Sequence, residues 1–85
     1  MNIMIKVFFF ARLREQLGCD FVEIEHSGVD TVEDLRRRLG EQYPHWVGFL
    51  NDKKLLVAVN QTLVKVVHPV KKGDEVAFFH PVTGG

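Results

Sequence analysis

The sequence predicts a single α+β domain in which one mixed β-sheet carries one main helix. The first and last regular segments, residues 3–10 and 75–79, are the most apolar stretches, and a capped amphipathic helix lies between them. Turn residues separate the remaining strand patterns. A chain of 85 residues has room for one small core and little material for an internal catalytic pocket. Function is therefore expected on a surface or at a terminus.

The N-terminal third predicts a strand, a short helix and a second strand. Residues 3–10 (IMIKVFFF) are almost continuously apolar, which predicts a central strand covered on much of both faces. Residues 11–17 (ARLREQL) are good helix formers, and Gly18 can take the left-handed conformation that ends a helix. Residues 20–25 partly alternate between apolar and acidic side chains, which predicts a half-buried strand antiparallel to the first.

The main helix is predicted from residue 32 to about residue 43. Thr31 and Asp34 have the spacing of a capping box, in which each side chain satisfies a free backbone donor at the helix start. Pro44 prevents the helix from continuing. One apolar stripe is expected to face the sheet, and it consists of Val32, Leu35 and Leu39.

The C-terminal part predicts three more strands, at residues 55–59, 63–67 and 75–79, with turns at residues 60–62 and 71–74. Pro81 ends the last strand because it has no amide hydrogen to donate. The order of strand, short helix, strand, longer helix and three strands is typical of a β-grasp (ubiquitin-like) fold. In that fold the first and last strands lie parallel at the centre, which explains their apolar composition.

We expect residues 1–80 to form this β-grasp domain and residues 81–85 to form a flexible, extended tail that ends in Gly84 and Gly85. A terminal glycine carboxylate is ionised at neutral pH, and no Cβ shields its carbonyl carbon. Such a group can attack the α-phosphorus of ATP, and a sulfur nucleophile can convert the resulting adenylate into a thiocarboxylate. Two residues without side chains would also let the tail enter a narrow channel in a partner.

Composition and charge exclude several classes of function. Eleven basic and eleven acidic residues give a net charge of zero, which predicts no binding to nucleic acid or to anionic membranes. Lys6 interrupts the apolar start, so neither a signal peptide nor a membrane span is expected. Cys19 has no partner for a disulfide, and the histidines lack the spacing of a metal site. We therefore expect a cytoplasmic protein with no bound metal or cofactor.

Three segments resemble the small, sulfur-carrying subunits of molybdopterin synthases: residues 6–15 (KVFFFARLRE), 55–64 (LLVAVNQTLV) and 73–85 (GDEVAFFHPVTGG). The chain is more distantly similar to thiamine-pathway sulfur carriers and to ubiquitin-like modifiers. The resemblance implies that an adenylating enzyme, similar to the activators of ubiquitin, activates Gly85 with ATP and magnesium. It also implies a sulfur donor protein that supplies the thiocarboxylate sulfur.

The resemblance further implies that the thiocarboxylated tail enters the large synthase subunit, which holds the active site. There it gives its sulfur to cyclic pyranopterin monophosphate and forms the dithiolene of molybdopterin. In that family two copies of each subunit form a heterotetramer. The chain would then be a sulfur-donating subunit that is not catalytic by itself.

Strand parity predicts a partner surface beside the tail. Lys6 and Glu75 mark the solvent faces of the two central strands, and Phe10 and Phe79 share their respective parities. Exposed aromatic side chains at this place would mark a protein interface, unless a bulge or the short helix covers them. The resemblance favours the interface and adds further contact positions, which are Leu63, Pro81, Val82 and Thr83.

Other functions stay open at this stage. The chain could serve another pathway such as thiamine synthesis, although the capped helix and residues 59–64 (VNQTLV) fit the molybdopterin type better. It could also be a modifier that joins its tail to lysines, or a noncovalent interaction module that uses the aromatic surface. A terminal Gly-Gly pair could even be a frayed end without function. His80 departs from the family, where Pro is expected, and this leaves the direction of the tail less rigid.

Overall fold

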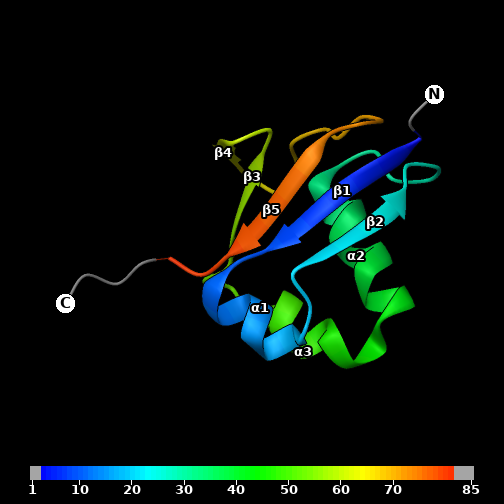
Figure 1. The fold of residues 1–85 in the computed structure, drawn as a ribbon. Coiled ribbons are helices and arrows are strands. Elements are labelled where there is room, and N and C mark those ends of the chain that lie inside the picture. Colours follow the sequence, from blue (N-terminus) through cyan, green and yellow to red (C-terminus); the bar gives the residue numbers. More distant parts are fainter. Residues whose placement is uncertain (1–2, 82–85) are drawn as a thin grey trace.

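The computed structural model describes residues 3–81, which form one five-stranded mixed sheet packed against helices (Figure 1). The elements are β1 (Met4–Phe9), α1 (Ala11–Leu17), β2 (Phe21–Glu25), α2 (Val32–Gln42), the 3-10 turn η1 (Pro44–Trp46), α3 (Val47–Leu50), β3 (Leu56–Val59), β4 (Thr62–Val64) and β5 (Glu75–Phe79). The strand order is β2-β1-β5-β3-β4. β1 and β5 are parallel, and the other neighbouring strands are antiparallel. This arrangement confirms the predicted β-grasp fold.

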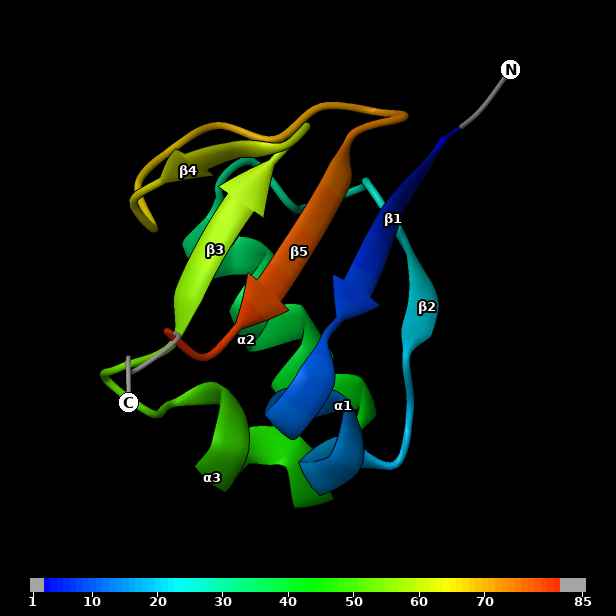
Figure 2. The same ribbon diagram turned by 60° about the vertical axis from the view of Figure 1, so that its left-hand side comes forward.

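The helices cover one face of the sheet and one of its ends. Figure 2 shows the sheet in front with α2 behind it, whereas α1 and α3 lie at the end where β1 and β5 finish (Figure 1). Ile5 and Val7 of β1 are fully buried, and the alternate residues of this strand are only half-buried. The expectation that the first strand is covered on much of both faces therefore holds fully for the face toward the helices and in part for the other face.

The ends of the helices follow the local signals in the sequence. Gly18 has φ 68°, and its amide donates to the Arg14 carbonyl oxygen at 2.9 Å, as expected for a helix-ending glycine. At the start of α2 the Asp34 amide donates to Thr31 Oγ1 at 3.2 Å, and the Asp34 carboxylate accepts from the Thr31 amide at 3.2 Å. The predicted capping box is confirmed.

β4 is shorter than predicted and begins one residue earlier. Asn60 and Gln61 have φ values of 50° and 71°, so the turn has two residues and Thr62 already pairs with β3. After Val64 the chain bonds to the helix instead of the sheet, since the Val66 carbonyl accepts from the Glu33 amide at 2.9 Å. The prediction of a strand to residue 67 is therefore wrong.

A short helical segment that the sequence did not predict closes the core. Trp46 of η1 is 3% exposed and stacks on Tyr43 with the ring centroids 4.1 Å apart. Trp46 also packs nearly perpendicular to the ring of Phe9, at 5.3 Å between centroids, and Leu50 of α3 is buried as well. The core therefore joins β1 to residues that follow Pro44, where the sequence showed no clear periodicity.

Within residues 3–81, no helix is both long enough and apolar enough to cross a membrane. The division into a domain of residues 1–80 and a tail of residues 81–85 stays a prediction, because residues 82–85 lie outside the described part of the chain.

Candidate functional site: an apolar sheet face beside the tail

One row of apolar side chains runs across all five strands on the face opposite the helices. Phe8 lies between Phe21 of β2 and Ala77 of β5, and Ala77 is opposite Ala58 of β3. Ala58 is in turn opposite Leu63 of β4. Residues directly opposite one another on paired strands point to the same side of the sheet. These five side chains therefore form a continuous strip.

A second, shorter row brings this surface to the end of β5. Phe79 is opposite Leu56, and the Phe10 amide donates to the Phe78 carbonyl oxygen at 3.4 Å on the other side of β5. We call the two rows together the open face, which consists of Phe8, Phe10, Phe21, Leu56, Ala58, Leu63, Ala77 and Phe79. The open face thus extends to the point where the chain leaves the sheet toward Pro81.

Several side chains of the open face are exposed to solvent. Leu63 is 61% exposed, Phe10 49% and Phe21 38%, while Phe79 is half-buried. The Phe8 ring stacks on Phe10 with centroids 6.3 Å apart and contacts Phe21 at 5.0 Å. Neither a bulge nor α1 covers Phe10, so the aromatic surface expected from strand parity is present.

The open face contains a shallow depression of about 260 Å³, lined by Phe8, Phe10, Gln61, Glu75 and Ala77. Next to it, Lys6 is opposite Glu75 on one side and Glu23 on the other. The face therefore has an apolar centre and a charged border. This arrangement is typical of surfaces that bind another protein.

The residue that precedes the predicted tail, His80, lies between side chains from two other parts of the chain and is the root of the tail. The side chain of His80 is 11% exposed, and its Nε2 lies 3.0 Å from Oε1 of Gln16 in α1. Its Nδ1 lies 4.0 Å from Oδ2 of Asp52, which follows α3. Pro81 is exposed. The other predicted tail residues, Val82, Thr83, Gly84 and Gly85, lie outside the described part of the chain.

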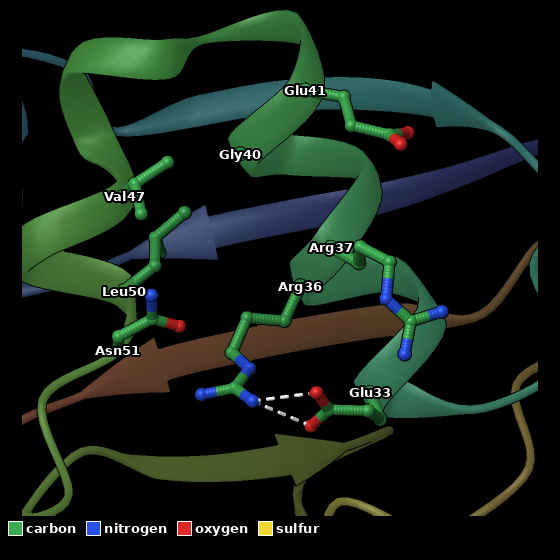
Figure 3. A pocket seen from close by; sticks show the side chains of 8 residues that line it. All are labelled: Glu33, Arg36, Arg37, Gly40, Glu41, Val47, Leu50 and Asn51. Atoms are coloured by element: carbon green, nitrogen blue, oxygen red, sulfur yellow. Dashed lines mark hydrogen bonds and ion pairs between the residues drawn. The ribbon is translucent and has the colours of Figure 1, made fainter.

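A larger depression of about 360 Å³ lies on the helix side, between α2 and α3 (Figure 3). Nη2 of Arg36 donates to both carboxylate oxygens of Glu33, at 2.6 and 2.7 Å, so these two charges neutralise each other. The depression offers neither a nucleophile with an adjacent base nor an unpaired buried polar group. Its lining consists of Glu33, Arg36, Arg37, Gly40, Glu41, Val47, Leu50 and Asn51.

The other residues considered for chemistry do not come together. Residues 3–81 contain no group of three His, Cys, Asp or Glu side chains with the geometry of a metal site. Sγ of Cys19 donates to the Phe21 carbonyl oxygen at 3.4 Å, and within residues 3–81 no basic side chain is hydrogen-bonded to this thiol. Among the residues described, the open face and the root of the tail are therefore the candidate functional site.

The chain is similar to known proteins over nearly its whole length. The model of the ThiS family matches residues 7–85, which include Gly84 and Gly85. The molybdopterin synthase sulfur carrier subunit of Escherichia coli (strain K12) is 55% identical over 96% of this chain and 100% of that protein. The protein with the same description in Haemophilus influenzae is 46% identical over the same shares of the two chains.

Solved structures agree with the fold. SAMP1 from Haloferax volcanii is 27% identical with a TM-score of 0.81, and the match covers 96% of this chain and 99% of that one. Subunits 1 and 2 of the molybdopterin-converting factor from Helicobacter pylori have been solved as a protein-protein complex. One chain of that structure matches with 25% identity and a TM-score of 0.68, over 96% of this chain and 99% of that one. The ubiquitin of Caldiarchaeum subterraneum, 17% identical with a TM-score of 0.60 over the whole of both chains, supports the fold alone.

Sequence reasoning missed one prominent member of the open face. Phe21 shares its parity with Glu23 and Glu25, so an exposed aromatic residue stands in line with two acidic ones. This aromatic residue on the acidic, solvent-facing side of the strand was the signal in the sequence that could have identified Phe21.

Proposed function

Because the chain belongs to the ThiS family, we propose that it is the sulfur carrier subunit of a molybdopterin synthase. The observation that carries this proposal is the 55% identity to the Escherichia coli subunit of that description over the whole length of that protein. The family match also extends through the last two glycines, on which the chemistry of a sulfur carrier depends.

The chemistry is proposed to take place at the carboxylate of Gly85. A carboxylate oxygen attacks the α-phosphorus of ATP, which is supplied with magnesium by an adenylating enzyme, and pyrophosphate leaves. Hydrosulfide released by the donor protein then attacks the carbonyl carbon, AMP leaves, and a thiocarboxylate remains. Glycine suits both steps because no side chain hinders the approach to its carbonyl carbon. The chain itself needs no bound cofactor for this role.

The open face is proposed to bind the large subunit of the synthase. Its exposed apolar side chains lie beside the root of the tail, so docking there would bring the tail to the partner. Subunits 1 and 2 of the Helicobacter pylori molybdopterin-converting factor form a protein-protein complex, which supports a partnership of this kind. The tail would enter the active site of the large subunit and give its sulfur to the pterin precursor. We propose a heterotetramer of two copies of each subunit, acting in the cytoplasm.

Intact-mass spectrometry tests this function directly. After incubation with the adenylating enzyme, ATP, magnesium and a sulfur donor, the mass should rise by the difference between one sulfur and one oxygen atom. Fragmentation should place that change at Gly85, and a variant that lacks Gly85 should gain no mass. A change localised elsewhere, or full cofactor assembly by the variant, would contradict the proposal.

A second candidate role follows from the structural similarity to SAMP1, since a matching Haloferax volcanii structure is that of a small archaeal modifier protein. An adenylated Gly85 could also react with the amino group of a lysine and form an isopeptide bond. Covalent adducts that carry this chain in cell lysates would support the role of a modifier. Their dependence on Gly85 would separate them from noncovalent complexes.

A further inference from the structure

His80 connects the last strand to two elements that lie far from it in the sequence. Its Nε2 is 3.0 Å from Oε1 of Gln16, which is 64 residues away in α1. An amide oxygen only accepts hydrogen bonds, so the proton of this bond must be on Nε2 of His80. The bond is partly buried, and the His80 side chain is 11% exposed. The ring therefore occupies a defined place between α1 and the loop that follows α3.

Asp52 borders the opposite side of the ring. Its Oδ1 accepts from the Lys54 amide at 2.9 Å, which fixes the carboxylate within its own loop, and its Oδ2 lies 4.0 Å from Nδ1 of His80. That distance is too long for a hydrogen bond. Asp52 therefore limits the space of the ring, whereas Gln16 supplies the directional contact.

The backbone at this place is restricted as well. Pro81 disfavours the helical region for the residue before it, so it keeps His80 extended. The side chain and the backbone of one residue are thus both held where the chain leaves β5. Beyond Pro81 the sequence has no proline and ends in two glycines. Within the described residues, His80 and Pro81 are therefore the positions at which the chain is held as it leaves the sheet.

We infer that His80 is a positioning residue for sulfur delivery, because its bond to Gln16 fixes the direction in which the tail leaves the sheet. The inference rests on the proposed function. A tail whose root is held in advance loses less conformational freedom when it enters a partner, and this lowers the cost of binding. The side-chain contact of His80 restricts the chain at position 80, as a proline there would restrict it through its fixed φ.

Two substitutions of similar size distinguish the effect of the hydrogen bond from the effect of the volume of the ring. In His80→Gln, the amide nitrogen stands about where Nε2 of the imidazole was, so a donor toward Gln16 is kept. In His80→Asn, the shorter side chain places its amide near the position of Nδ1 and cannot reach Gln16. We expect His80→Asn to weaken the binding of the full chain to the large subunit by about fivefold, the factor that one net hydrogen bond represents. His80→Gln should stay within about twofold of the parent chain.

A tail deletion distinguishes positioning from an ordinary structural role. The affinity for the large subunit is measured by calorimetry for four chains: the parent, His80→Asn, a chain that lacks residues 82–85, and the combination. If His80 acts by directing the tail, His80→Asn should change the affinity only when the tail is present. Gln16→Leu should reproduce the loss of His80→Asn in the full chain and add little to it in the double variant.

The outcomes are distinct. Equal losses from His80→Asn with and without the tail, or no loss in the full chain, would overturn the inference while the parent chain still takes up sulfur and binds the large subunit. A parent chain that neither acquires sulfur nor binds the large subunit would contradict the proposed function and the inference together. The expected result is that His80→Gln keeps the parent affinity and that His80→Asn loses affinity only in the chain that keeps residues 82–85.

Discussion

The large side chains of the open face contribute little to the core of the domain. Leu63 is 61% exposed and Phe10 is 49% exposed, and both leave apolar surface in contact with water. Apolar surface in water costs about 25 cal/mol per Å² relative to burial, so a partner that covers this face gains free energy. Lys6 and the two acidic residues opposite it, Glu23 and Glu75, border this face, and charges at the border of an interface mainly set specificity.

Single substitutions on the open face should weaken partner binding without unfolding the protein. Leu63→Asp and Phe79→Asp each place a carboxylate in an apolar interface, where it loses its hydration without gaining an ion pair. We expect the dissociation constant for the large subunit to rise by about tenfold or more, as for central interface residues. The measurement is calorimetry with the purified subunits.

Val67→Asp is the matched control for these variants. Val67 is 77% exposed but lies outside the five strands, so the same change of charge should leave the affinity unaltered. Equal affinities of all three variants would contradict the assignment of the interface to the open face.

At the scale of single elements, the capping box determines where α2 begins. Thr31→Ala removes the oxygen that accepts from the Asp34 amide. We expect the free energy of unfolding to fall by about 1 kcal/mol, the usual cost of losing a capping side chain. Urea denaturation measures this loss, and Thr31→Ser, which keeps the oxygen, should recover most of it.

The Asp34 carboxylate makes this helix start sensitive to acid. Hydrogen bonds from the Asp30 amide, and secondly from Thr31, hold the pKa of Asp34 below its ordinary value of 3.8. A lowered pKa in the folded state stabilises the fold at pH values above 3.8, and this stabilisation is lost as the pH falls through the folded-state pKa.

Comparison of the parent chain with Asp34→Asn tests this dependence. The parent should be the more stable of the two at neutral pH, and the difference in the free energy of unfolding should shrink as the pH falls below 3.8. Urea titrations at several pH values provide the data. A difference that stays constant down to pH values well under 3.8 would mean that the charge of Asp34 is not involved.

The elements that local signals define were predicted correctly. Residues 11–17 and 75–79 form α1 and β5 with the predicted bounds, because a helix-ending glycine and a following proline mark their ends. By contrast, η1 and α3 were not predicted, since the apolar residues in 44–50 (PHWVGFL) follow neither the helical period nor the alternation of a strand. Their conformation depends on the place of Trp46 against Phe9, a contact that only the tertiary structure creates.

The candidate site was predictable to the extent that it follows from strand parity. Alternation in β1 and β5 placed Phe10 and Phe79 on the same face as Lys6 and Glu75, and the register agrees. Lys6 and Glu75 also indicated the solvent-facing side, but strand parity did not exclude a bulge or α1 as a cover for the aromatic side chains. The contact of His80 with Gln16 was not predictable either, because it joins residues 64 positions apart whose identities indicate no pairing. The glycine tail was recognised from its chemistry and from the resemblance.

At the scale of the whole molecule, one aromatic cluster connects the sheet to the segment after α2. Trp46 lies between Phe9 of β1 and the ring of Tyr43, and only 3% of its surface is exposed. Trp46→Ala should lower the free energy of unfolding by about 3–5 kcal/mol, a large part of the total for a domain of this size.

Trp46→Phe keeps the aromatic contacts and should cost clearly less. The Nε1 donor of Trp46 has no hydrogen-bond partner within the described residues, so its removal costs no hydrogen bond. Thermal or urea unfolding distinguishes the two variants. Similar losses for both would mean that the indole, and not aromatic packing in general, is required at this position.

The parallel pairing of β1 with β5 has a consequence for the synthesis of the protein. β1 spans Met4–Phe9, whereas β5 ends only at Phe79, so the ribosome must have passed residue 79 before the middle of the sheet can assemble. Until then the nascent chain holds only two-stranded ribbons, which are marginal in water. A polypeptide whose translation stops early therefore stays accessible to proteases. Only a chain whose synthesis has passed β5 can acquire the fold.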